Sequence, residues 1–474
     1  MTRSLAFVAL VALALAASAC GGSSSSGPVC NTVAQAGCAA GQYCEPLTNG
    51  GVGCFAPVLL RGTVLDPTAV TTALDGARVV ALDANRAPVS TVAVSASGGA
   101  YELKVRATRD TSGKPVSASV TLRADRQDYQ TFPGGIRPAL PIDLSTAAPS
   151  GTSWIVSGPL TALQLLPLVG GGTAYVHGTV AKAPGGAAQL VVAEPVSGGA
   201  GLTGVADRDG SYAVFNLALS TSYVVTAYAK GANYVPVTTG VLTNVDNSVS
   251  LSLAGAAAAT VSGDLIFNNG ATQDSDVTLV IESTYLSTLD RGESAPGLTV
   301  HAAGNSPYAF TGVPDGKYVV LAAFGIDGNV RDLSSSSGMA AAPRVTVSGA
   351  PVSADSFKIV PAVDLLTIGG TSVGADPIVA VTTAAPEFAW SRGSVDALAK
   401  TYRVLVFDSF GDQVWSHDMA ATPNDSLAYA GSTLQVGMPY QLRILAIKET
   451  MPVPSTFEQL SQTEDLAGVF TYQP

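Results

Sequence analysis

Charged side chains are scarce in this chain of 474 residues, since Asp, Glu, Lys and Arg make up only 12% of it. The 35 acidic residues outnumber the 24 basic ones, and the formal net charge is −11. Affinity for nucleic acid depends on Lys and Arg that neutralise phosphates, and anionic lipid headgroups attract the same residues. The composition therefore excludes nucleic acid as a partner and provides no basic patch for a membrane surface.

Histidine is scarcer still: the only three are His177, His301 and His417, far apart in the sequence. Zinc sites and Ser-His-Asp catalysis both need a histidine within hydrogen-bond reach of its partners. Nothing in the spacing brings one of these histidines to another. We therefore expect no catalytic residue, no metal and no cofactor. The alternative is a hydrolase whose site spans two domains.

Long hydrophobic runs are also lacking. The longest covers residues 5–17, shorter than the roughly 20 residues that a helix needs to cross a ~30 Å hydrocarbon core. Arg3 precedes this run, and the small residues Ser18 and Ala19 follow it. A positive charge, a short apolar core and a small-residue cleavage site are typical of a secretory signal peptide. The sequence thus predicts that residues 1–19 are a signal peptide and that the protein is exported.

Cys20 follows that cleavage site directly and is itself followed by a Gly/Ser tract at residues 21–27. This arrangement resembles a bacterial lipoprotein, in which the cysteine is acylated and becomes the mature N-terminus. The resemblance implies that the membrane is a partner through a lipid on Cys20, and that residues 20–29 are a flexible tether. With Gly21 after the cysteine, it implies the outer membrane of a two-membrane bacterium. The alternative is ordinary cleavage after Ala19, which leaves a secreted protein with a free Cys20.

The four remaining cysteines are clustered, and none follows them in the chain. They are Cys30, Cys38, Cys44 and Cys54. An even cluster in an exported chain predicts two disulfides, with three pairings open. Zinc is the alternative, but the spacing lacks the close cysteine pairs of zinc knuckles. Residues 30–57 are therefore expected to form a small module in which disulfides replace a hydrophobic core.

Glycine and proline are abundant, with 50 and 28 residues. Together with the low charge, they favour short strands joined by tight turns over helices. Tyr101, Leu103 and Val105 alternate with Glu102 and Lys104, which is the period of a half-buried strand. Turn signals about every 8–12 residues are typical of a β-sandwich. The expected fold class is all-β, with several domains because each takes roughly 100–200 residues.

A loose repeat runs through most of the chain, in which a Gly-containing strand start precedes a turn and a tyrosine strand. The strand starts are Arg61-Gly62-Thr63-Val64, His177-Gly178-Thr179-Val180 and Ser262-Gly263-Asp264-Leu265, and the tyrosine strands contain Tyr101, Tyr212 and Tyr308. The second copy has the clearest turn, Asp207-Arg208-Asp209-Gly210. The third copy departs most from the pattern.

These motifs resemble the carboxypeptidase regulatory-like domain, a prealbumin-like (Ig-like) β-sandwich that occurs as an accessory module in exported bacterial proteins. The resemblance implies three copies, at residues 58–146, 173–254 and 258–362. It implies no activity, because no carboxypeptidase catalytic domain accompanies them. Residues 147–172 are rich in Pro and Gly and are expected to be an interdomain linker, in which residues 160–168 are a candidate strand that closes the first sandwich.

The pattern changes near residue 363. A strand with Trp390, a strand that starts at Tyr402 and a late strand that starts at Tyr440 together resemble a fibronectin type III-like sandwich. The resemblance implies that residues 363–474 form this domain, with Trp390 in its core. Trp415 follows a Gly-Asp turn and is the candidate surface aromatic for an extracellular glycan or protein ligand. The alternative is that Trp415 packs in the core, as aromatics in strands usually do.

Acidic pairs are the last candidates for chemistry. Asp207 and Asp209, before Gly210, resemble half of a calcium loop, but the rest of the loop pattern is missing. Asp and Gly also form hairpin turns, which is the favoured interpretation. The same interpretation applies to Asp274 with Asp276 and to Asp408 with Asp412.

The sequence as a whole predicts a lipid-anchored, non-catalytic protein of the cell envelope. At 3.3 Å per strand residue, four sandwiches in a row would project on the order of 100 Å from the membrane. The expected role is a surface stalk or binding scaffold. The alternative is an adhesin that binds carbohydrate or protein through aromatic or loop residues of one sandwich.

Overall fold

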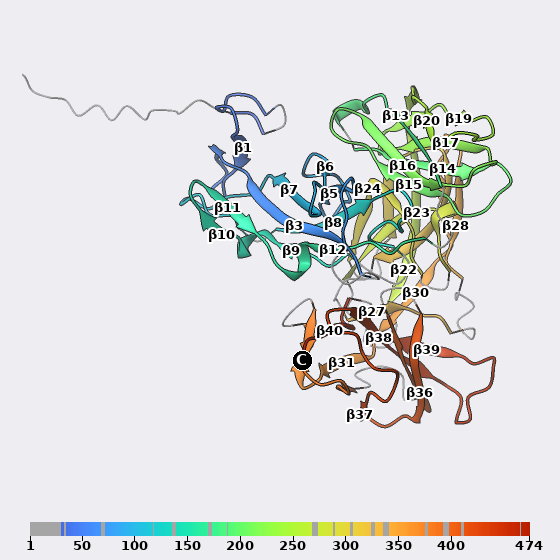
Figure 1. The fold of residues 1–474 in the computed structure, drawn as a ribbon. Helices are drawn as coiled ribbons and strands as arrows, with labels where there is room; N and C mark the ends of the chain where they lie inside the picture. Colours follow the sequence, from blue (N-terminus) through green and yellow to red (C-terminus); the bar gives the residue numbers. More distant parts are fainter. Residues whose placement is uncertain are drawn as a thin grey trace, which may run out of the picture.

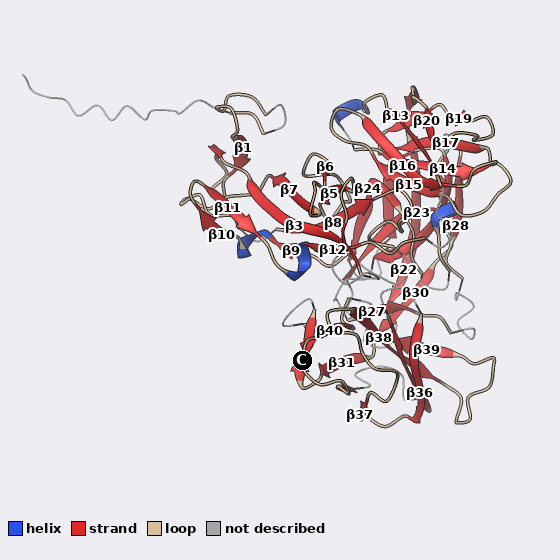
Figure 2. Ribbon diagram, viewed as in Figure 1, coloured by secondary structure: helices blue, strands red, loops and turns tan. Residues whose placement is uncertain are grey.

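The computed structural model is built from β-sandwiches that follow a small N-terminal module (Figure 1). It describes residues 30–474 except 33–34, 68–71, 117, 135–138, 169–172, 187, 268–273, 288–289, 304–306, 324–327, 335–340, 375–377, 392–397, 409–411 and 465. Strands dominate this part of the chain, and its helices are short 3-10 turns (Figure 2). The predicted all-β fold, with tandem sandwiches behind a disulfide-bonded segment, is confirmed. Among the described helices, none has the length and apolar character to cross a membrane.

The N-terminal module is a hairpin in which β1 (Tyr43–Pro46) pairs antiparallel with β2 (Val52–Phe55). The register places Cys44 opposite Cys54. Such a short hairpin buries few side chains, and isolated hairpins are at best marginally stable in water. The module therefore depends on its cross-links and on the sandwich that follows it.

Sandwich 1 has two sheets that enclose an aliphatic core with Tyr101 in it. The first sheet has the order β10-β11-β3-β12, with β4 and β7 also paired to β3, and the second has the order β6-β5-β8-β9. The elements are β3 (Val58–Asp66), β4 (Thr72–Ala73), β5 (Arg78–Leu82), β6 (Ala93–Val94), β7 (Ala100–Val105), β8 (Ser119–Asp125), β9 (Ile142–Asp143), η1 (Leu144–Thr146), β10 (Ala148–Ser150), β11 (Ser153–Val156), η2 (Pro159–Thr161) and β12 (Ala162–Gln164). Along β7, buried and exposed residues alternate as the sequence predicts.

The prediction that residues 147–172 are an interdomain linker is wrong, because this segment contains three strands of sandwich 1. β11 and β12 both pair in parallel with β3. The Pro and Gly residues that led to the linker assignment divide this segment into strands of three or four residues, too short to show an alternation. The candidate strand at residues 160–168 does contain β12.

Sandwich 2 comprises the sheets β16-β13-β20 and β15-β14-β17-β19 and the strand pair β18-β21. Its elements are β13 (Ala174–Thr179), η3 (Pro184–Gly186), β14 (Leu190–Pro195), β15 (Leu202–Val205), β16 (Ser211–Leu217), β17 (Tyr223–Tyr228), β18 (Ala232–Tyr234), β19 (Val237–Thr238), β20 (Asp246–Ser248) and β21 (Leu253–Ala256). β14 is buried on both faces, which is typical of a strand that lies between two layers.

Sandwich 3 comprises the sheet β25-β22-β30-β27, with β29 also paired to β22, and the sheet β24-β23-β26-β28. Its elements are β22 (Ala259–Phe267), β23 (Asp274–Ile281), η4 (Glu282–Thr284), β24 (Ser294–Ala303), β25 (Pro307–Val313), β26 (Gly316–Ala323), β27 (Asn329–Arg331), β28 (Arg344–Val347), β29 (Val352–Ser353) and β30 (Phe357–Pro361).

Sandwich 4 comprises the sheets β32-β31-β34-β37 and β33-β40-β38-β35-β36, with β39 also paired to β38. Its elements are β31 (Asp364–Ile368), β32 (Thr371–Ser372), β33 (Val379–Val381), β34 (Glu387–Ser391), β35 (Thr401–Phe407), β36 (Gln413–Ala420), β37 (Asn424–Ala428), β38 (Pro439–Ile447), β39 (Gln459–Gln462) and β40 (Val469–Tyr472). Trp390 is fully buried between the two sheets, as the sequence predicts.

The repeated Gly and Tyr residues are cross-strand partners in sandwiches 1 to 3. The pairs are Gly62 with Tyr101, Gly178 with Tyr212 and Gly263 with Tyr308. A β-carbon at Gly62 would lie 1.8 Å from the carbonyl oxygen of Thr161, and the Tyr101 hydroxyl donates to that oxygen at 2.7 Å. Sandwich 2 has the same arrangement at the carbonyl of Val249. In sandwich 3 the buried Tyr308 hydroxyl has no hydrogen-bond partner among the described residues, which agrees with the divergence of that copy.

The four sandwiches do not form the extended row that was expected from the sequence. Sandwiches 1 and 3, which are not neighbours in the chain, are joined by the ion pair of Arg123 with Glu293 and by a hydrogen bond from Gly297 N to Asn85 O at 3.0 Å. A cleft of about 200 Å³ is lined by residues of sandwiches 1 and 4 alone. In Figure 1, sandwich 4 accordingly lies below sandwiches 1 to 3.

Shared hydrophobic packing explains the difference. The prediction of an extended row assumed that each sandwich buries only its own core. However, Leu190, Val192 and Val205 on the outer face of sandwich 2 belong to the same buried cluster as the core of sandwich 3. Burial of apolar area contributes roughly 25 cal/mol per Å². Sandwiches 2 and 3 are therefore held face to face by a common core.

Candidate functional site

Cys20, the predicted lipid-attachment residue, and the signal peptide before it lie outside the described residues. The lipid therefore stays a prediction. The described chain begins at Cys30, which is buried.

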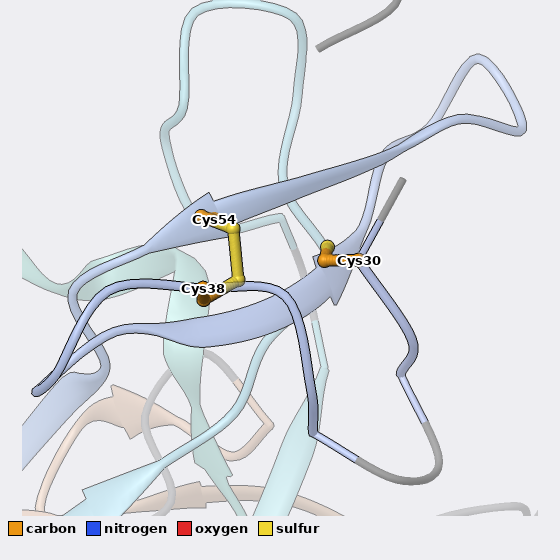
Figure 3. A group of neighbouring side chains, drawn as sticks. All are labelled: Cys30, Cys38 and Cys54. Atoms are coloured by element: carbon orange, nitrogen blue, oxygen red, sulfur yellow. A yellow bond between two sulfur atoms is a disulfide. The ribbon is translucent and has the colours of Figure 1, made fainter. Parts of the chain in front are cut away.

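The four cysteines of the module form the disulfides Cys30–Cys44 and Cys38–Cys54, so the prediction that they pair among themselves is confirmed. Figure 3 shows the Cys38–Cys54 bond with the sulfur of Cys30 beside it, and the three sulfurs lie within 4.8 Å of one another. Zinc binds thiolates, whereas these sulfurs are bonded to each other. The structure thus contradicts the zinc alternative at these cysteines.

Replacement of both Cys30 and Cys44 by serine is expected to destabilise the module by about 3 kcal/mol, because the bond closes a loop of 14 residues in sequence. Limited proteolysis with mass spectrometry would measure the loss of protection in residues 30–57. Sandwich 4 serves as the internal control and should stay protected. Equal protection of the module in variant and wild type would contradict the prediction.

The module is fixed to sandwich 1 by a buried ion pair. Glu45 on β1 and Arg109, in the loop after β7, contact each other directly, and both side chains are at most 1% exposed. Arg109 also donates to the carbonyl of Ala56 at 2.7 Å, and its guanidinium lies over the ring of Phe55. Glu45 accepts a further hydrogen bond from the backbone of Ala107 at 3.0 Å. The module and sandwich 1 are therefore one structural unit.

Trp415, the predicted ligand-binding aromatic, lies on the edge strand β36 and is half-buried. Its ring stacks on His417 with centroids 6.1 Å apart and contacts Tyr429 edge-on at 5.2 Å. It also packs against the core of sandwich 4. Trp415 therefore packs on the core, as in the alternative weighed from the sequence, and its role in ligand binding stays a prediction.

The three histidines lie on three different sandwiches. His177 pairs with Asp246 at 2.8 Å and His301 pairs with Asp276 at 3.0 Å. All four side chains are between 43% and 61% exposed, so water competes with both pairs. The structure brings no two of these histidines onto one sandwich, and the expectation of no catalytic residue stays a prediction.

The acidic pairs form turns and partner contacts. Gly210 N donates to Asp207 O at 2.9 Å, and Ser211 N donates to the Asp209 carboxylate at 2.8 Å, as in a hairpin turn. The Asp207 carboxylate accepts a hydrogen bond from Val92 N of sandwich 1 at 3.2 Å. Asp408 and Asp412 are bonded to each other: Asp408 N donates to Asp412 O at 3.0 Å, and Asp412 N donates to the Asp408 carboxylate at 3.1 Å.

A cavity of about 410 Å³ lies where all four sandwiches meet. Arg123 at its wall is 1% exposed and is bonded to Asp125 in its own sheet at 2.8 and 2.9 Å. It also bonds to Glu293 of sandwich 3 at 3.1 Å and to Thr203 of sandwich 2 at 3.0 Å. The buried charges of the cavity wall thus hold three sandwiches together. This group has no local signal in the sequence, because its members are up to 170 residues apart.

No protein-family model matches the chain, and the comparison with curated proteins found no match. Solved structures do show a likeness. The Bacillus anthracis TIE protein is 10% identical over 85% of this chain and 68% of its own, with a TM-score of 0.17. A streptococcal ancillary pilin is 12% identical over 63% and 98%, with a TM-score of 0.15. A tetra-tandem repeat from the extending region of a large adhesion protein is 14% identical over 86% and 99%, with a TM-score of 0.13.

TM-scores of this size do not establish a common arrangement of domains. The likeness therefore carries no argument about what this chain binds or does. The evidence for function comes from the residues of the chain itself.

Proposed function

We propose that this protein is a non-catalytic scaffold of the cell envelope, held by a lipid on Cys20 at the outer membrane of a two-membrane bacterium. The observation that carries the proposal is that the buried ionic groups join domains to one another. Glu45 with Arg109 fixes the module to sandwich 1, and Arg123 links sandwiches 1, 2 and 3. Such contacts favour a rigid body over a set of mobile domains.

The start of the sequence and the disulfides support the location. The disulfides require an oxidising compartment, as expected for an exported protein. In the proposal, the lipid and the Gly/Ser-rich residues 20–29 attach the disulfide-bonded module to the membrane, and the sandwiches extend from it as a compact body.

Labelling of growing cells with palmitate tests the anchor. Wild type is expected to incorporate the label and to remain with the membrane fraction, whereas Cys20→Ala should lose both because the acylated thiol is absent. Cys38→Ser is the matched control, because its thiol belongs to a disulfide, and it should still be labelled. Label that survives Cys20→Ala, or no label in wild type, would contradict the proposal.

Ligand binding at Trp415 is the second candidate function. The specific observation in its favour is the stacked pair of Trp415 and His417 on an edge strand, with His417 exposed. Aromatic rings with one accessible side are common in binding sites. Loss of a glycan or protein ligand in Trp415→Ala would support this function.

A further inference from the structure

The outer face of the sheet β16-β13-β20 in sandwich 2 carries a group of rings that the sequence did not single out. Along β13, Ala174 and Val176 point into the core, so Tyr175 and His177 lie on the opposite face. The ring of Tyr175 lies between two others, with centroids 5.6 Å from Phe215 on β16 and 5.7 Å from His177. All three side chains are only partly buried. In Figure 1 this sheet is at the top of the molecule and sandwich 4 is at the bottom.

A carboxylate is held at the edge of these rings. Asp246, at the start of β20, accepts a hydrogen bond from the Tyr175 hydroxyl at 2.7 Å and contacts His177 Nε2 at 2.8 Å. The hydrogen bond from Tyr175 lowers the pKa of Asp246, and the same bond raises the pKa of Tyr175. The Asp246 side chain is nevertheless 61% exposed. A carboxylate has about four acceptor positions, so it keeps acceptors that face solvent.

Hydroxyl groups extend the polar part of this face. Ser248 follows on β20 as the register partner of His177 and is exposed. Thr179 and Ser250 are also exposed, and their hydroxyl oxygens lie 3.4 Å apart. Rings thus lie beside a fixed acceptor and a row of hydroxyls on one open sheet face.

We infer that Tyr175, Phe215, His177 and Asp246 form a binding surface for a neutral saccharide. The inference rests on the proposed function, since it supplies the ligand class for an envelope scaffold. The C–H face of a pyranose ring packs on an aromatic ring, and its hydroxyls donate to a carboxylate or share hydrogen bonds with serine and threonine. A few fixed polar groups beside apolar rings are the usual composition of a small-molecule site.

Charge favours a neutral saccharide over an acidic one. The group has an exposed carboxylate beside its rings, and the chain has a net charge of −11. A uronic acid or sulfated sugar would therefore meet like charge at short range. Among the residues that the structure describes on this face, there is also no arginine to bind a carboxylate or sulfate group in a bidentate manner.

Affinity gel electrophoresis of the full mature protein tests this inference with three neutral polysaccharides as probes: amylopectin, laminarin and galactomannan. Wild type is expected to be retarded by at least one of them, and Tyr175→Ala is expected to weaken that retardation at least tenfold. Tyr175→Phe keeps the ring but loses the hydrogen bond to Asp246, so it should fall between the two. Unchanged thermal unfolding would show that Tyr175→Ala is folded.

Tyr285→Ala is the matched control, because it removes a half-buried tyrosine that also donates to a carboxylate, at 2.7 Å, but on sandwich 3, and it should bind as wild type does. If Trp415→Ala lost binding and Tyr175→Ala kept it in full, the inference would be overturned. The protein would still be a saccharide-binding scaffold, with its site on sandwich 4. Absence of retardation in all three gels, or tighter binding to heparin than to any of them, would also overturn it. The palmitate result decides the scaffold proposal separately, so the two can fail independently.

Discussion

Glu45→Ala is expected to lower the free energy of unfolding of the N-terminal module and sandwich 1 by about 3–5 kcal/mol. The reason is that Glu45 and Arg109 are buried together, so the substitution leaves the Arg109 guanidinium without its counter-charge. Chemical denaturation followed by far-UV circular dichroism, together with limited proteolysis of residues 30–57, would measure the loss. The module should become protease-sensitive at denaturant concentrations that leave sandwich 4 intact.

Arg109→Ala removes the other half of the pair and adds a pH dependence. Burial raises the pKa of Glu45 above its ordinary value, and Arg109 opposes that shift. Without Arg109 the pKa of Glu45 should rise further. A carboxyl whose pKa is raised in the folded state contributes stability that is present below its unfolded pKa and is lost as pH rises through the folded value. Arg109→Ala should therefore be less destabilised at pH 4 than at pH 8.

An exposed ion pair in the same sandwich provides the control. Arg61 and Glu102 also form a single ion pair, at 2.8 Å, but their side chains are 50% and 39% exposed. Arg61→Ala should change stability by no more than about 1 kcal/mol. If Glu45→Ala and Arg61→Ala have equal effects, the buried pair does not fix the module to sandwich 1.

The core strands of the sandwiches could be predicted because their signal is local. The alternation in β7 depends on neighbouring residues, and so does the Gly-then-Tyr repeat. The structure adds the reason for that repeat: Gly62 leaves room for the Thr161 carbonyl, to which the opposite Tyr101 donates. Sequence showed both halves of this motif but not that they are cross-strand partners. That pairing depends on the fold, because β3 pairs with β7 and also with β12, the strand that follows Thr161.

The domain contacts could not be predicted because they depend on non-local partners. Arg123 stands in β8 as a single cation in a strand, where solvent exposure is the ordinary expectation. Its burial depends on Glu293 and Thr203, which belong to other sandwiches. The prediction of a row of domains was wrong for the same reason. In sequence, β14 with its two apolar faces is indistinguishable from an ordinary buried strand.

The candidate sites show the same limit. Trp415 could be selected because it follows a Gly-Asp turn closely in the sequence, which is a local signal. Tyr175, Phe215 and Asp246 come from three strands, so only the register of β13 with β16 and β20 brings them together. Sequence named His177 and the strand around it, but it assigned no role to Tyr175 or Phe215.

Arg123→Ala is expected to separate sandwich 1 from sandwiches 2 and 3. Without the guanidinium, Asp125 and Glu293 would be left at the junction as two carboxylates with no cation between them, and removal of one partner from a buried ion pair costs about 3–5 kcal/mol. The contacts that remain between sandwiches 1 and 2 are mostly single hydrogen bonds, such as Asp128 N to the Asn216 side chain at 2.8 Å. Sandwiches 2 and 3 should stay together, because they share one core.

Small-angle X-ray scattering of the mature protein would measure this separation. A compact chain of this length has a radius of gyration of roughly 22 Å, whereas a rod on the order of 100 Å long gives about 30 Å. Wild type should lie near the first value, and Arg123→Ala should shift toward the second. Arg403→Ala is the matched control, since it breaks an ion pair with Asp418 inside sandwich 4 and should leave the radius unchanged. A wild-type radius near 30 Å would mean that the sandwiches form a row after all. An unchanged radius in Arg123→Ala would mean that the remaining contacts hold sandwich 1 in place without this ion pair.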